Sequence, residues 1–293
     1  MRRKMLINRL PLYLFFILFS AVSGHGCSVP VFRYALERWR ADFYTVIVST
    51  RGTLEDEAVA LLQEHAIDHD SLSNYTVRTI DLSTPAGARY AEENDITTTP
   101  WLALYYPSHA NVRGLVWQGP LNETNVKRLI HSPARTAVAE KLLAGEVAMW
   151  LFIESGDPKK DDRARKIVQQ TLERAAKELK IPSTGVDIDG NAIEVTDFVD
   201  YVVHFDVIDI ARDDSTEMIL LSALLGSEPD LPFYDEPMVF PVFGRGRALH
   251  AIIGDGITEK TVFDGCRSIT AWCSCEIKAQ NPGIDLLISA DWS

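Results

Sequence analysis

The chain has 293 residues and a formal net charge of −12, which gives it the length of two ordinary domains and an acidic surface. Such a surface repels phosphate, so we exclude nucleic acid and anionic membrane surfaces from the expected partners. Apolar residues make up 46% of the sequence, enough for each domain to bury a core.

The first 24 residues have the pattern of a secretory signal peptide. Basic residues begin the chain, and residues 10–22 form an uncharged apolar run. This run is shorter than the roughly 20 residues that an ordinary membrane-spanning helix needs. We expect cleavage before His25 and a periplasmic or extracellular protein. The alternatives are an uncleaved signal that anchors the protein in the membrane, and lipidation of Cys27.

Residues 25–133 alternate between helical and strand patterns. Apolar residues at helical spacing predict amphipathic helices, and β-branched apolar runs predict buried strands. In chain order we expect a helix at 28–39, a strand at 43–49, a helix capped by Thr53, a strand at 75–82, a helix at 85–93, strands at 96–107 and 114–118, and a helix at 123–131. Helices between the early strands favour parallel pairing, and the short link between the last two strands indicates a hairpin.

A helix at 134–145 is expected to connect this part to residues 146–293, where the order partly repeats. There we expect a strand at 147–154, a helix at 159–179, a hairpin at 185–195, a strand at 201–210, a helix at 215–225, two strands within 237–256, a helix at 258–279 and an apolar tail at 284–289. The polar stretch 154–163 is expected to be solvated.

This order of elements resembles the thioredoxin fold, and it occurs twice. Thr99-Pro100 and Phe240-Pro241 match the proline that this family places before its third core strand, where the peptide bond is usually cis. The resemblance implies an α/β fold with two thioredoxin-like domains in tandem, residues 25–133 and 146–293, each with a central mixed sheet flanked by helices. The run that begins at Cys27, Cys-Ser-x-Pro-Val-Phe-Arg-Tyr, is also similar to an uncharacterised family of exported bacterial proteins.

The redox motif of the thioredoxin family is missing from both halves. A redox thioredoxin has Cys-x-x-Cys at the start of the helix after its first core strand, where the helix N-terminus favours the thiolate. The matching stretches here, Ser49–Thr53 and Glu154–Pro158, contain no cysteine. In this the chain is similar to redox-silent thioredoxin domains that bind polypeptides. We therefore expect a protein-binding or assembly module without a cofactor. Its partner would be another exported or membrane protein, held between the domains or at the surfaces around Pro100 and Pro241.

The four cysteines leave three interpretations open. Cys27, Cys266, Cys273 and Cys275 all follow the predicted signal, and an even number in an exported protein fits disulfide bonding. If the last three share one helix, Cys266 and Cys273 lie about 10 Å apart along its axis, too far for a disulfide. The interpretations are a bridge from Cys27 to a C-terminal cysteine, buried free thiols, and a redox pair.

Two functions of other classes follow from the same cysteines. A thiol–disulfide oxidoreductase would use Cys273 and Cys275, with Cys27 or Cys266 as the resolving thiol. A soft-metal carrier would bind a metal such as copper(I) through Cys273 and Cys275. No metal site is assigned, because the spacing of His65 and His69 is a loose motif on its own.

Overall fold

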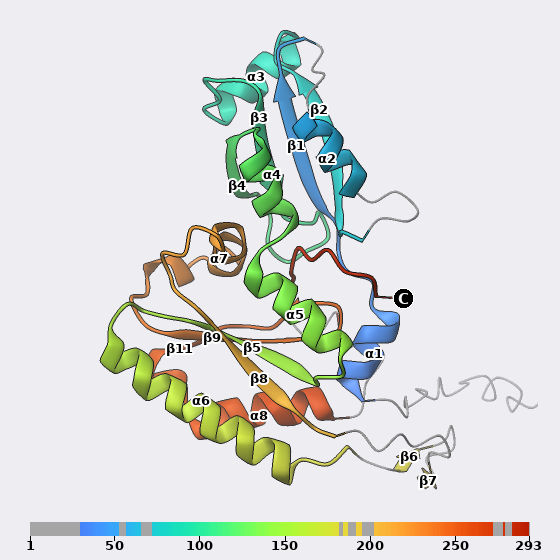
Figure 1. Cartoon of the computed structure of the whole chain (residues 1–293), viewed down its shortest axis with the longest axis vertical. Helices are drawn as coiled ribbons and strands as arrows, with labels where there is room; N and C mark the ends of the chain where they lie inside the picture. Colours follow the sequence, from blue (N-terminus) through green and yellow to red (C-terminus); the bar gives the residue numbers. More distant parts are fainter. Residues whose placement is uncertain are drawn as a thin grey trace, which may run out of the picture.

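Two mixed β-sheets flanked by helices organise the computed structural model of the chain (Figure 1), which confirms the predicted α/β class. The structure describes residues 30–52, 57–65, 72–181, 184–186, 192–194, 202–271, 278 and 283–292. Figure 1 shows the first sheet with its helices above, the second below, and α5 (Pro133–Leu143) between them.

The first sheet has the strand order β2-β1-β3-β4. Its strands are β1 (Tyr44–Thr50), β2 (Tyr75–Asp81), β3 (Trp101–Tyr105) and β4 (Leu115–Pro120). As expected from the connections, β1 and β2 are parallel, whereas β3 is antiparallel to β1 and β4 to β3. The helices of this half are α2 (Glu57–His65), α3 (Pro85–Glu93) and α4 (Glu123–Ile130), whereas α1 (Val31–Arg38) precedes β1 in the chain but packs on the second half. The side chains of Thr84 and Asn122 cap α3 and α4 by accepting otherwise unpaired backbone N–H groups.

The second sheet has the order β12-β10-β9-β5-β8, with β11 also paired to β9. Its strands are β5 (Ala148–Ile153), β8 (Phe205–Ile210), β9 (Met238–Phe243), β10 (Arg247–Ala248), β11 (Ile252–Ile253) and β12 (Ile284–Asp285). Its helices are α6 (Pro158–Glu178), α7 (Met218–Leu225) and α8 (Glu259–Thr270), with short 3₁₀ turns η1 (Leu231–Phe233) and η2 (Gly254–Gly256). The predicted hairpin is formed by β6 (Thr184–Val186) and β7 (Ala192–Glu194).

The two sheets repeat one topology. β5 and β8 are parallel and β9 is antiparallel to β5, as in β1, β2 and β3 of the first sheet. The place of β4 is taken by the short strands β10 and β11, which both pair antiparallel with β9. β5 is buried along its whole length because helices cover both faces of its sheet. In Figure 1, α6 and α8 lie on one face, and α5 and α7 on the other.

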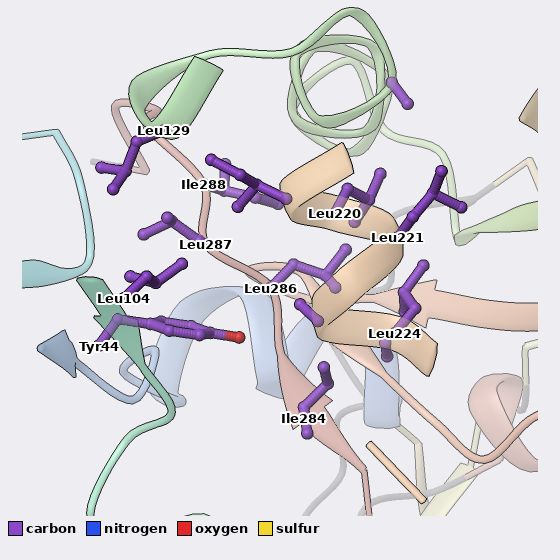
Figure 2. Packing of buried hydrophobic residues seen from close by; sticks show 14 of the residues in the cluster. Tyr44, Leu104, Leu129, Leu220, Leu221, Leu224, Ile284, Leu286, Leu287 and Ile288 are labelled. Atoms are coloured by element: carbon purple, nitrogen blue, oxygen red, sulfur yellow. The ribbon is translucent and has the colours of Figure 1, made fainter. Parts of the chain in front are cut away.

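One hydrophobic cluster joins the two halves. It includes Tyr44 and Leu104 of the first sheet, Met149 of the second, and Leu220 of α7. Figure 2 shows the side chains of residues 286–288 between the first half and α7. The apolar tail after residue 283 is therefore part of the cluster that both halves share.

Backbone and side-chain hydrogen bonds hold this tail against the first half. Asn74 donates to the Leu286 carbonyl over 3.1 Å and accepts from the Ile288 N–H over 2.9 Å. Farther along, the Ala290 N–H donates to the Leu72 carbonyl over 2.8 Å, and Ser73 and Ser289 pair in an isolated antiparallel β-bridge. The tail thus continues along the start of β2 after leaving the second sheet at β12.

The predicted helix at 258–279 is interrupted at Ala271; residues 272–277 lie outside the described part of the chain, and residue 278 is helical. The observed helix, α8, ends at Thr270, and Ala271 is extended with φ −67° and ψ 167°. The Ala271 carbonyl accepts a hydrogen bond of 2.9 Å from the Val31 N–H at the start of α1. This tertiary contact takes the chain out of the helix, and helical spacing alone does not reveal it. Cys273 lies outside the described residues, beyond the end of the helix that carries Cys266.

Shortening a buried side chain at the centre of the tail should destabilise the whole structure. Leu286 is fully buried, so Leu286→Ala should lower the free energy of unfolding by about 2–5 kcal/mol through lost burial and an unfilled cavity. Leu143→Ala, at a residue 47% exposed, should change it by less than about 0.5 kcal/mol. Guanidinium unfolding followed by circular dichroism measures both; equal effects would contradict the role given to the tail.

Candidate functional site

The two sheets present equivalent ends, located where β1 and β5 finish. Ser49 of β1 pairs with Trp101, the first residue of β3, and Ile153 of β5 pairs with Met238, the first residue of β9. Pro100 and Pro237 directly precede these two residues, so they occupy matching positions. We call the Pro100 region the first end and the Pro237 region the second end.

The sequence pointed to the correct proline in the first half and to the wrong one in the second. The Thr99–Pro100 peptide bond is cis, as the resemblance implied. Pro241 lies inside β9, opposite Trp150, and is buried, and its peptide bond is not among the cis bonds of the described residues. A buried residue in the middle of a strand offers no surface, so the predicted binding surface around Pro241 is wrong. Both Pro237 and Pro241 precede apolar residues, and the sequence does not show which one the strand follows.

The first end is polar and exposed. Thr97, Thr98 and Thr99 lie on the surface before Pro100. Across from them, the Asp81 carboxylate accepts hydrogen bonds from the Ser83 N–H over 2.8 Å and from the Gly52 N–H over 3.4 Å. The hydrogen bond from Ser83 is the main reason that the pKa of Asp81 lies below its ordinary value. The carboxylate is therefore ionised and fixes the turn that follows β1.

At the second end, a buried carboxylate accepts hydrogen bonds from the loop that follows β5. Asp161, in the first turn of α6, is 5% exposed. One of its oxygens accepts hydrogen bonds of 2.8 Å from both the N–H and the hydroxyl of Ser155, and the other accepts from the Gly156 N–H over 3.2 Å. The Ser155 hydroxyl also accepts from the Asp157 N–H over 3.1 Å. The hydroxyl is thus engaged in shaping the loop. The stretch at 154–163 is largely exposed, as predicted, except for the buried Asp161 that organises its turn.

A hollow lies beside this closed turn. Its volume is about 350 Å³, and its lining includes Ala164, Ile167, Pro237 and Ile257. The Lys160 ammonium lies 2.6 Å from the Glu236 carboxylate at its border and 3.3 Å from the Asp235 carbonyl. The second end therefore combines a small, mostly apolar floor with an ion pair.

The space between the two halves is filled by the tail rather than open. A second hollow, of about 390 Å³, lies at the rim of this junction and is lined by Asn111, Arg113, Glu228 and His250 among others. The Tyr106 hydroxyl crosses the junction and donates to the Ala223 carbonyl over 2.7 Å. A partner held between the halves would have to displace these contacts, which makes the two ends the better candidates for binding.

Of the candidate cysteines, the described residues include Cys266. It lies in α8, is fully buried next to Trp150 and has a free thiol. Burial raises its pKa to about 12, so the thiol stays neutral and unreactive. Cys27, Cys273 and Cys275 lie outside the described residues, so the redox pair and the metal carrier remain predictions.

The described residues contain no group of three or more His, Cys, Asp or Glu side chains that could hold a metal ion. Of the two histidines at metal-ligand spacing, His65 lies at the end of α2, where its Nδ1 is 3.0 Å from the Leu61 carbonyl. Its ring packs edge-on against that of His131, while His69 is outside the described residues.

Comparison with known proteins does not assign the chain to a family. No protein-family model matches the sequence, and no curated protein matches it. Within the segments that the structure describes, no helix is both long and apolar enough to cross a membrane.

Sequence reasoning missed two features of the second end, Pro237 and Asp161. A signal for Asp161 existed: an acidic residue in the first turn after a Ser-Gly-Asp-Pro stretch is well placed to accept hydrogen bonds from the loop. Its burial, however, depends on how α6 packs on the sheet, which the local sequence does not encode.

Cys266 should resist alkylation in the folded protein. With a pKa of about 12, its thiolate fraction at pH 8 is more than about 10³-fold below that of an ordinary thiol, and burial also blocks access. Iodoacetamide labelling followed by peptide mass spectrometry should leave Cys266 unmodified in the native protein and modify it in urea. Native labelling at the rate of an exposed thiol would contradict its placement in the core.

Proposed function

We propose that the chain is an exported, redox-silent protein of two thioredoxin-like domains that binds another exported or membrane protein. The strand orders β2-β1-β3-β4 and β8-β5-β9-β10/β11, with the same directions in both sheets, support the repeated fold. The cis bond before Pro100 and the matching place of Pro237 are consistent with it. The apolar run at the start of the sequence supports export.

The proposal that the protein is redox-silent rests mainly on the turn at residues 155–157, which is held by hydrogen bonds to Asp161. A redox thioredoxin would have its cysteines in this turn. Here Ser155 and Gly156 occupy it, and their polar groups are engaged by one buried carboxylate. A turn fixed in this way supplies a rigid surface rather than a nucleophile, and binding at a rigid surface costs less conformational entropy.

We also propose that a disulfide joins Cys27 to Cys273 or Cys275 in the exported protein. The hydrogen bond from the Val31 N–H to the Ala271 carbonyl brings the two parts of the chain together at 2.9 Å. Cys27 is four residues before Val31, and Cys273 is two residues after Ala271. At roughly 3.5 Å per residue, both segments are long enough to meet, whereas Cys266 lies in the core as a free thiol.

Disulfide mapping tests this bridge. Non-reducing peptide mass spectrometry of the secreted protein should recover the Cys27 peptide linked to the peptide that contains Cys273 and Cys275. Because the bridge closes a long loop, Cys27→Ser should lower the free energy of unfolding by about 2–4 kcal/mol. A labile Cys273–Cys275 bond with a potential near that of thioredoxins would instead favour the oxidoreductase. Copper(I) bound in a one-to-one ratio after mild purification would favour the metal carrier.

Site-specific crosslinking tests the binding function. A photoreactive amino acid at the exposed Thr98 or Lys159 samples the first and second ends, and the same residue at the exposed Glu140 on α5 is the control. We expect one exported or membrane protein to be crosslinked from at least one end and not from position 140, and to bind again when both proteins are purified. Reduction of insulin disulfides that depends on Cys273 and Cys275, with no crosslinked partner, would contradict the proposal.

A further inference from the structure

The loop between α7 and β9 displays two aromatic side chains on the surface. Phe233 is 84% exposed and Tyr234 is 40% exposed. An aromatic ring that is almost fully in water removes little apolar surface from solvent, so it contributes little to the folding stability of the isolated chain. Exposed apolar groups of this kind mark surfaces that another molecule covers when they form part of a built patch.

The turn that carries Phe233 is anchored. Leu231 is fully buried below it, and the Phe233 N–H donates to the Asp230 carbonyl over 3.0 Å. The Tyr234 N–H donates to the Leu231 carbonyl over 3.3 Å, and its hydroxyl lies 3.3 Å from the Asp230 carboxylate. These bonds hold the backbone of η1 in place, so the Phe233 ring is presented from a fixed base.

Carboxylates surround the two rings. Residues 228–236 contain Glu228, Asp230, Asp235 and Glu236, and no lysine or arginine. Lys160 pairs with Glu236, and His250 lies 3.2 Å from Glu228. Among the described residues, neither Asp230 nor Asp235 forms an ion pair of its own, although Lys160 lies close enough for the Asp235 charge to act on it. The described residues around the two rings therefore carry more negative than positive charge, with Lys160 as the neighbouring cation.

The lining of the hollow at the second end begins two residues after Tyr234 in the chain. Its border residues Glu236 and Pro237 directly follow the aromatic turn in the chain, and its floor includes Ala164, Ile167 and Ile257. An exposed aromatic ring, carboxylates and a recess of about 350 Å³ thus belong to adjoining stretches of chain; the basic residues of the recess, Lys160 and Arg163, face Glu236 and Asp255. We call this set, residues 230–237 with the recess, the aromatic–acidic surface.

We propose that the aromatic–acidic surface is the docking site for a basic segment of the partner protein, a proposal that rests on the proposed function. The segment packs apolar atoms on Phe233 and sets lysine or arginine side chains against Asp230 and Asp235. An apolar centre with a charged rim is the usual anatomy of a protein interface. A second copy of this chain would bring a further net charge of −12, and anionic lipid would be repelled in the same way, so charge complementarity selects a basic polypeptide.

Selection of peptides on the purified, export-processed protein tests this proposal. The probe is a library of random 12-residue peptides displayed on phage, selected at low salt, with the enriched sequences then synthesised. We expect enriched peptides to be net positive and to contain an apolar residue. Their affinity for Phe233→Ser should be at least about 30-fold weaker, the usual loss at an aromatic hot spot. Asp235→Asn should weaken binding several-fold and reduce its dependence on salt.

The controls are matched to these variants. Leu143→Ser removes another exposed apolar side chain, on α5, and Glu92→Gln removes an exposed carboxylate on α3. Both should bind the peptides as the unmodified protein does, and Phe233→Ser should keep the unfolding temperature because its ring is exposed. Enriched peptides without positive charge, or peptides that bind Phe233→Ser equally well, would overturn the proposal. If the peptides reject the aromatic–acidic surface in this way, a partner crosslinked at Thr98 would still support the proposed function.

Discussion

The carboxylate of Asp285 is the contact on which the arrangement of the two halves depends. It is 3% exposed, and a buried charge is tolerated only when it is well paired. Arg247 and Lys278 each lie 3.0 Å from one of its oxygens, and the Asp42 N–H donates to it over 2.7 Å. Its own carbonyl accepts from the Tyr44 hydroxyl over 2.7 Å. These groups come from both halves, so Asp285 fixes the point at which the apolar tail leaves the second sheet and enters the shared core.

The hydrophobic cluster shared by the two halves has consequences for the two ends. The cluster that contains the tail reaches from β1 and β3 to β5, β9 and α7, and these strands carry the first and second ends at their termini. Because the strands share one packed interior, the ends are held at a fixed separation. A rigid body with two differing surfaces, one polar at Pro100 and one aromatic and acidic at Phe233, is suited to recognition. This agrees with the proposed function, in which the turn closed by Asp161 takes the place of a reactive thiol.

The local sequence pattern was sufficient to predict most helices and strands, but it did not predict the contacts between them. Apolar spacing correctly predicted the order and type of most helices and strands, although two strands were expected within residues 237–256 and the structure has three. Short polar side chains such as Asn122 correctly marked helix starts. The end of α8 at Thr270 depends on Val31, which is distant in sequence, and the choice between Pro237 and Pro241 depends on the register of β9 against β5. The apolar tail was visible as a run of residues, but its position between the halves is a tertiary fact. Likewise, four carboxylates and two aromatic residues can be read in the sequence around Phe233, whereas the exposure of that ring cannot.

Native-state hydrogen exchange tests most directly whether the two halves form one cooperative unit. The amides of β1 and β5, measured in increasing guanidinium below the unfolding midpoint, report the opening free energy of each sheet separately. The shared core predicts that both sets exchange through the same global opening, with equal free energies and equal dependence on denaturant. A lower free energy and a smaller denaturant dependence for β1 alone would show that the first half opens by itself, and would contradict the account.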